Sequence, residues 1–170
     1  MKSFRFDPDF ADASGIQYRG FVECLYRAVT DIGRDGLHYC EIGCGQGETA
    51  LIAGCLPQVA AVTTIDRRFT DAADQRLQAI AEKVTKLTGL SEDLWSEIDT
   101  PDILYVDGNH DFLKVQADLS LYGARVASDG VICGHDYCDK WPGVVAAVDE
   151  YAERYGYAVT KYRDGSWRLL

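Results

Sequence analysis

Apolar residues recur along the chain with two alternating periods, and this pattern predicts that helices and strands alternate. Residues 16–32 carry apolar side chains every three or four positions, as on one face of a helix, and Gly33 follows as a stop. Short β-branched and apolar runs predict five strands: residues 37–42, 59–65, 84–87, 102–106 and 131–133. Helical spacing predicts further helices: residues 48–55, 71–81 with Asp71 as N-cap, a short one with Ser91 as N-cap, 112–126 and 142–155.

The last part of the chain predicts a β-hairpin. Residues 157–162 and 166–170 read as strands around Asp164 and Gly165, a dipeptide typical of tight turns. Strand–helix units followed by a hairpin are typical of an α/β fold: a doubly wound, Rossmann-like, mainly parallel sheet with helices on both faces. Ligands of such sheets bind at the carboxyl ends of the strands, so we expect functional residues directly after each strand.

Length, charge and cysteine content restrict the class of protein. At 170 residues the chain has about the length of one domain, with a helical segment in residues 1–36 and a core in residues 37–170. Its 17 basic and 27 acidic side chains give a net charge of −10, which argues against nucleic acid or an anionic membrane surface as a partner. No apolar run approaches the ~20 residues of a membrane-spanning helix, and we expect no secretory signal. The six cysteines match neither a zinc site nor a disulfide scaffold, so we expect reduced thiols in a cytoplasmic protein.

A glycine-rich segment, Glu41–Gly47, follows the first predicted strand and opens a helix. Glycine lets a backbone turn sharply and approach a ligand closely, and a helix N-terminus offers free amide donors. The spacing is not that of a dinucleotide site, because the third glycine would fall at position 48, which is Glu48. No Gly-Lys-Ser or Gly-Lys-Thr sequence follows, so the segment is not a P-loop either. The acidic Glu41 favours a ligand with a positive group over a polyphosphate.

The sequence Glu41-Ile42-Gly43-Cys44-Gly45-Gln46-Gly47 resembles the first motif of class I S-adenosylmethionine-dependent methyltransferases. In that family the acid and the glycines hold the methionine end of the cofactor. An acid that closes the second strand, here Asp66, accepts hydrogen bonds from both ribose hydroxyls. Where relatives often carry Gly-Asp-Ser against the adenine, this chain has Gly89-Leu90-Ser91, so Leu90 replaces the acid. The resemblance implies these cofactor-binding residues: Glu41, Gly43, Cys44, Gly45, Gly47, Thr49, Asp66, Arg67, Ser91, Asp107 and Gly108.

Two polar segments, Val106–His110 and Gly134–Tyr137, follow the fourth and fifth predicted strands and contain two of the three histidines. Adjacent parallel strands would bring their carboxylates and imidazoles around one cleft, where they can act as a general base or as metal ligands. Together with Trp141–Val144, these segments resemble a small bacterial family that is grouped with macrocin-type and cephalosporin-tailoring O-methyltransferases. The resemblance extends from about Leu37 to Tyr155. It implies a seven-stranded sheet whose last strand lies antiparallel beside the fifth, as the hairpin also suggests.

The side chains of this second cluster are candidates for catalysis and metal binding. His110 is expected to be the general base, with Asp107 beside it, because an imidazole with a pKa near ~6.5 suits proton transfer at neutral pH. A structural role, orienting the loop or holding Asp107, is the alternative for His110. The resemblance implies that Asp107 and Asp136 match carboxylates that bind magnesium in some relatives. The third metal position, acidic in those relatives, is His135 here, and Asn109 also replaces an aspartate.

Aromatic residues near the predicted cleft allow two interpretations. Tyr18, Tyr137 and Trp141 could line an acceptor pocket, or Trp141 could only fix the start of the helix that follows it. Tyr155 is expected in the core because it lies on the apolar face of its helix, and His38 is expected at the surface.

We therefore expect an S-adenosylmethionine-dependent methyltransferase that acts on a hydroxyl group of a small molecule. Magnesium as a second cofactor stays open: the resemblance implies it, whereas His135 argues against it because magnesium prefers oxygen ligands. A homodimer is expected as well, because only about 36 residues precede the first strand and an acceptor lid must be short or come from a second subunit. Two alternatives stay open. One is a catalytically silent S-adenosylmethionine-binding module, which the replacements at positions 90, 109 and 135 suggest. The other is a dinucleotide-dependent oxidoreductase, which Glu48 disfavours.

Overall fold

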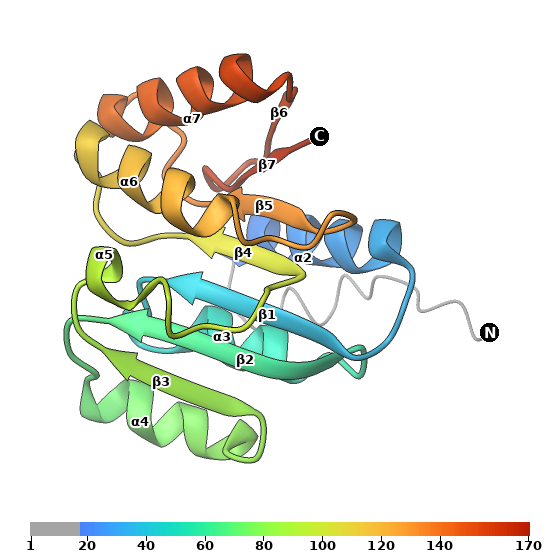
Figure 1. Ribbon diagram of the computed structural model, residues 1–170. Helices are drawn as coiled ribbons and strands as arrows, with labels where there is room; N and C mark the ends of the chain where they lie inside the picture. Colours follow the sequence, from blue (N-terminus) through green and yellow to red (C-terminus); the bar gives the residue numbers. More distant parts are fainter. Residues whose placement is uncertain (1–17) are drawn as a thin grey trace.

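The computed structural model describes residues 18–170, which form one seven-stranded sheet with helices on both sides (Figure 1). The strand order is β3-β2-β1-β4-β5-β7-β6; β1 to β5 run parallel, and β7 lies antiparallel between β5 and β6. The strands are β1 (Leu37–Ile42), β2 (Val59–Asp66), β3 (Val84–Thr88), β4 (Ile103–Val106), β5 (Val131–Gly134), β6 (Val159–Lys161) and β7 (Trp167–Leu169). The predicted Rossmann-like fold with its C-terminal hairpin is confirmed, while the start of the first predicted helix, residues 16 and 17, lies outside the described residues.

The helices bury their apolar faces against the two sides of the sheet, and each side has its own hydrophobic core. One core joins α2, α3 and α4 to Tyr39 and Tyr105, and the other joins α6 and α7 to Ile42 and Leu104. Among residues 18–170, no helix has the length and apolar character needed to cross a membrane. The helices are α2 (Arg19–Ile32), α3 (Glu48–Gly54), α4 (Asp71–Leu77), the 3₁₀ turn η2 (Gln78–Ile80), α5 (Ser91–Leu94), α6 (Phe112–Gly123) and α7 (Pro142–Tyr155).

Two predicted helix caps are wrong. Thr70 caps α4, since its hydroxyl oxygen accepts a hydrogen bond from the amide of Ala73 at 3.1 Å, and Asp71 is the first helical residue. Ser91 is likewise the first residue of α5 rather than its cap, and its hydroxyl donates to the carboxylate of Asp118. The helix boundaries themselves lie close to the predicted ones.

The expected environments of two further residues are also wrong. Tyr155 is 56% exposed at the end of α7, where it packs on the ring of Tyr151 with 4.5 Å between ring centroids. His38 is half-buried, and its Nε2 lies 2.9 Å from the hydroxyl oxygen of Thr63 on the neighbouring strand. The exposure of each residue depends on side-chain contacts that the pattern of apolar positions in the sequence does not show.

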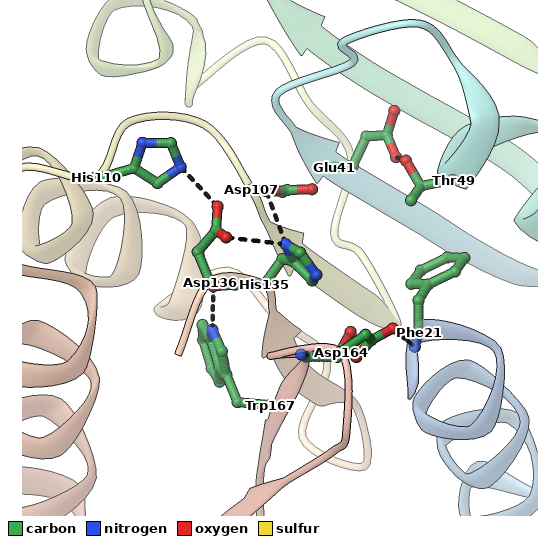
Figure 2. A network of polar contacts seen from close by, with 10 residues as sticks. Phe21, Glu41, Thr49, Asp107, His110, His135, Asp136, Asp164 and Trp167 are labelled. Carbon is green, nitrogen blue, oxygen red and sulfur yellow. Dashed lines mark hydrogen bonds and ion pairs between the residues drawn. The ribbon is translucent and has the colours of Figure 1, made fainter. Parts of the chain in front are cut away.

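The turn of the C-terminal hairpin holds the start of α2. Asp164, between β6 and β7, accepts a hydrogen bond from the amide of Phe21 at 2.8 Å and another from the amide of Ser166 at 2.9 Å. Gly20 allows this approach, because a Cβ atom there would lie 1.9 Å from the Asp164 carboxylate. The contact brings the first turn of α2 close to the carboxyl edge of the sheet (Figure 2).

Candidate active site

A cleft with a volume of about 350 Å³ lies at the carboxyl edge of the parallel strands. Its lining comes from the loops that follow β1, β2, β3 and β4, together with two side chains of α6. The volume falls in the range typical of small-molecule sites, and the edge is the one where such sheets bind ligands. The lining residues that matter below are Gly43, Gly45, Asp66, Arg67, Leu90, Ser91, Glu92, Asp107, Gly108, Lys114 and Asp118.

The glycine-rich loop approaches the next loop so closely that a side chain would not fit. Gly43 has a φ of +94°, and a Cβ atom there would lie 2.1 Å from the carbonyl oxygen of Asp107. Gly45 also has a positive φ, of +54°, but nothing lies within 4 Å of the position of its Cβ. The loop is thus closed on the side of β4 and open on the side of the cleft, which suits a backbone cradle for a ligand.

The carboxylate of Asp66, at the end of β2, holds this loop. Oδ2 accepts hydrogen bonds from the amides of Cys44 at 3.0 Å and Gly45 at 3.2 Å, and Oδ1 accepts one from the amide of Arg68 at 3.2 Å. A carboxylate has about four acceptor positions, so Oδ1 keeps capacity for a donor that enters the cleft.

Glu41 lies behind the loop rather than in the cleft. Its side chain is fully buried, and its carboxylate accepts hydrogen bonds from the hydroxyls of Thr49 at 2.7 Å, Thr64 at 2.8 Å and Tyr39 at 3.0 Å. Burial raises the pKa of Glu41 to about 7, although the three hydroxyls act in the opposite direction. Glu41 therefore supports the loop from the core and has no direct access to a ligand.

Of the predicted cofactor-binding residues, some line the cleft and others shape it from outside. The residues that line it are Gly43, Gly45, Asp66, Arg67, Ser91, Asp107 and Gly108. The residues outside its lining are Glu41, Cys44, Gly47 and Thr49.

Asp118 of α6, which the sequence analysis did not select, closes the end of the cleft near α5. Its Oδ1 accepts a hydrogen bond of 2.5 Å from the hydroxyl of Ser91, and the hydroxyl of Tyr122 donates to the carbonyl oxygen of Ser91 at 2.7 Å. A signal was present in the sequence, since Asp118 is an acid on the otherwise apolar face formed by Val115, Leu119 and Tyr122.

The loops after β4 and β5 bring two carboxylates and two imidazoles together, as expected (Figure 2). His110 Nε2 lies 2.6 Å from Oδ2 of Asp136. His135 Nδ1 lies 3.3 Å from Oδ1 of Asp136 and 3.8 Å from Oδ1 of Asp107. His110 thus pairs with Asp136, not with Asp107, and a cavity of about 10 Å³ lies between these side chains.

The charges of this cluster are coupled. Burial raises the pKa of Asp107, and the nearby His135 acts against this shift. Burial also works against a charged His135, but its hydrogen bond to Asp136 and the charges of Asp107 and Asp136 raise its pKa to about 9. Burial opposes ionisation of Asp136 too, yet the two histidines lower its pKa. An ionised Asp136 beside a protonated His135 is therefore the stable arrangement at neutral pH.

The ring of His110 is fixed from two sides. The indole of Trp141 stacks on it with 3.9 Å between centroids and 16° between planes, while Asp136 holds Nε2. Asp136 itself has a φ of +61°, and the amide of the next residue, Tyr137, donates to the carbonyl oxygen of Gly165 at 2.9 Å in the hairpin turn. A positive φ outside glycine often marks a functional position.

The other two aromatic candidates are placed differently from Trp141. The hydroxyl of Tyr137 donates to Asp149 on α7 at 2.6 Å, and Tyr137 lines neither the cleft nor the cavity beside His110. Tyr18 stands at the N-cap position of α2.

Among the described residues, the group that can bring one ligand atom each within 4.8 Å of one another is Asp107, His110 and Asp136. His110 thus takes the place that the sequence analysis gave to His135. Magnesium prefers a cage of oxygen ligands, whereas imidazoles contact both oxygens of Asp136 in this cluster. The donor set does not fit magnesium.

In chemical terms the site combines two parts at one edge of the sheet. The cleft offers a backbone cradle and a carboxylate that can accept hydrogen bonds from hydroxyls. Beside it, an imidazole is held by a carboxylate and an aromatic ring, the arrangement of a positioned proton acceptor.

Comparison with known proteins gives a consistent result. Residues 40–137, more than half of the chain, match the family model described as a methyltransferase domain. No protein of curated function matches the sequence.

Solved structures resemble the fold. Precorrin-6y C5,15-methyltransferase of Geobacter metallireducens aligns with a TM-score of 0.65 and 14% identity over 99% of this chain and 90% of that chain. The N-methyltransferase NodS of Bradyrhizobium japonicum aligns with a TM-score of 0.65 and 15% identity over 91% and 94%. Precorrin 8w decarboxylase of Methanobacterium thermoautotrophicum aligns with a TM-score of 0.65 and 19% identity over 86% and 87%. At these identities the likeness is one of fold.

Proposed function

This chain belongs to the methyltransferase domain family, and from that membership we propose that it moves a methyl group from S-adenosylmethionine to a hydroxyl group of a small molecule. One observation carries the proposal: the loop Asp107–Asn109 lines both the large cleft and the small cavity beside His110. A ligand bound in the cleft therefore lies next to an imidazole that a carboxylate holds in place.

The cleft residues suit S-adenosylmethionine, which supplies a methyl group bound to a sulfonium sulfur. The free capacity of Asp66 Oδ1 suits a ribose hydroxyl, and the open side of Gly45 suits close backbone contact with the methionine part. Asp107 and Gly108 border the same space from the β4 side. Glu41 and Thr49 contribute by holding the loop in shape, not by contact.

His110 is the proposed general base. In a neutral imidazole one nitrogen donates and the other accepts, and the carboxylate of Asp136 requires Nε2 to be the donor. Nδ1 is then the acceptor for the proton of the substrate hydroxyl. Asp136 and Trp141 are positioning residues in this scheme, because they hold the ring without taking the proton.

Magnesium has no role in this proposal, because the ion prefers a cage of oxygen ligands and imidazoles contact both oxygens of Asp136 in this cluster. The predicted homodimer and the predicted link to the macrocin-type subfamily stay predictions.

A catalytically silent binding module is the second candidate function. It is favoured by Leu90, which is 45% exposed at the cleft where relatives often carry an acid. Such a module would bind the cofactor without turnover.

The test measures binding and methyl transfer separately. Isothermal titration with S-adenosylmethionine should give saturable binding, and Asp66→Ala should weaken it about 10- to 100-fold through loss of charge-assisted hydrogen bonds. Asp99→Ala, at an exposed position, is the matched control. A panel of hydroxylated small molecules with labelled methyl donor then reports transfer. Absence of binding contradicts the proposal, and binding without transfer to any acceptor supports the silent module.

A further inference from the structure

At the adenine end of the proposed cofactor site, the position where relatives often carry an acid is Leu90, but another element places an acidic side chain there. Leu90, at the start of α5, carries no polar group. Asp118 reaches the same end of the cleft from α6, and both residues belong to the cleft lining. The acid therefore comes from an element 28 positions further along the chain.

One half of the Asp118 carboxyl group is free. Oδ1 accepts the hydroxyl proton of Ser91, whereas Oδ2 has no hydrogen-bond partner among residues 18–170. Lys114, a cationic residue of α6 that also lines the cleft, donates from Nζ to Oε1 of Glu92 at 2.6 Å and is therefore paired with Glu92 rather than with Asp118. Asp118 as a whole is only 3% exposed and lines the cleft, so the cleft is the side from which a ligand can reach the free oxygen. A ligand that supplies a donor there gains a hydrogen bond to a charged group.

We propose that Asp118 recognises the base of the cofactor by accepting a hydrogen bond from the 6-amino group of adenine at Oδ2. This inference rests on the proposed function, since it takes S-adenosylmethionine as the ligand of the cleft. A carboxylate oxygen only accepts hydrogen bonds, and adenine presents a donor at position 6. Hypoxanthine presents an oxygen there, which would face the carboxylate oxygen without a proton between them. The site therefore selects adenine over hypoxanthine.

A purely structural role is the rival explanation. Asp118 could serve only to fix Ser91, whose carbonyl oxygen Tyr122 also holds. In that case removal of the carboxylate would weaken every nucleoside equally, whatever the group at position 6. Ser91→Ala separates the two roles, because it removes the clamp and leaves the carboxylate in place.

The experiment is isothermal titration of the full chain with S-adenosylhomocysteine and with S-inosylhomocysteine, which differ at position 6 of the base. We expect the unmodified chain to bind the adenine compound at least ~10-fold more tightly, as sites that hydrogen-bond a substrate group reject analogues without it. Asp118→Leu removes both carboxylate oxygens and offers no acceptor, so it should weaken the adenine compound and bring the two affinities within about threefold of each other. Ser91→Ala should retain the preference for adenine, and the exposed Asp93→Asn should match the unmodified chain.

Each outcome decides between the explanations. Equal affinity of the unmodified chain for both compounds overturns the inference without any variant, so the inference can be tested even if Asp118→Leu fails to fold. Retention of the adenine preference in Asp118→Leu, or an equal loss for both compounds, also overturns it and leaves the proposed function standing. Failure of the unmodified chain to bind either compound contradicts the proposed function itself.

Discussion

His110 and Asp136 are joined by a contact of 2.6 Å between Nε2 and Oδ2, although 26 positions separate them in the chain. The pairing decides which nitrogen of the imidazole can take a proton. We expect His110→Ala to reduce the turnover rate about 100-fold or more, because general-base catalysis typically contributes that much. Binding of S-adenosylmethionine, measured by titration, should stay unchanged.

Asp136→Asn tests the positioning role of the carboxylate. Asparagine tolerates the positive φ of this position, so the fold should be retained. Its amide leaves the imidazole tautomer unspecified, and we expect a lower kcat with an unchanged affinity for the cofactor. An unaltered kcat in both His110→Ala and Asp136→Asn would assign these residues to structure alone.

Gly43→Ala tests the contact between the two loops. A methyl group would meet the carbonyl oxygen of Asp107 at 2.1 Å, and we expect a loss of about 3 kcal/mol in the free energy of unfolding. Gly36→Ala is the matched control, since Gly36 has a φ of +80° but nothing within 4 Å of its Cβ position, and it should lose only about 1 kcal/mol. Equal losses in urea denaturation would show that backbone strain, and not the contact, restricts position 43.

Glu41→Gln tests the buried carboxyl group through pH. Its pKa is raised to about 7, so between about pH 4.5 and 7 the folded state holds a proton that the unfolded state has lost. This group therefore makes the folded state less stable as the pH rises through that window, by up to about 3 kcal/mol. The stability of Glu41→Gln should fall less over the same range, while Glu82→Gln, at an exposed position, should follow the unmodified chain. Parallel curves for all three would contradict a protonated Glu41.

The affinity for S-adenosylhomocysteine should also depend on pH. Burial raises the pKa of Asp118 to about 6, while Ser91 and Lys114 lower it and Glu92 raises it. An ionised carboxylate is the better acceptor, so the affinity should fall as the pH drops below about 6. Titrations from pH 5 to 8 should show this decrease in the unmodified chain and in Glu92→Gln, but not in Asp118→Asn.

Removal of divalent metal ions tests whether methyl transfer needs magnesium at the cluster of Asp107, His110 and Asp136. We expect a chelator to leave methyl transfer unchanged, because magnesium lacks an oxygen cage among these side chains. Loss of transfer with EDTA and its recovery with magnesium would instead support the ion that the resemblance implies.

The sequence was sufficient for the sheet and for the edge of the sheet at which the cleft lies. The strand limits could be predicted from short β-branched runs between glycines and prolines. The Asp164–Gly165 dipeptide predicted the turn of the hairpin. The direction in which Glu41 points could not be predicted, because β1 is buried on both faces and its apolar pattern has no period of two.

Contacts between distant elements were also beyond sequence reasoning. The acid at the α5 end of the cleft comes from α6, and it meets Ser91 only because the two helices pack together. The partner of His110 depends on the unusual backbone angle of Asp136. Single-sequence patterns specify local conformation and burial, whereas these pairings arise from tertiary packing.

The strand order has a consequence for biosynthesis. Among the strands of residues 18–170, β6 pairs only with β7, and β7 must enter between β5 and β6 after both have been made. Until β7 has joined the sheet, β6 has no neighbouring strand there and the outer edge of β5 is unpaired. The sheet is therefore completed only when residues 167–169 leave the exit tunnel, and a nascent chain stalled before that point would expose a bare strand edge to chaperones or to aggregation.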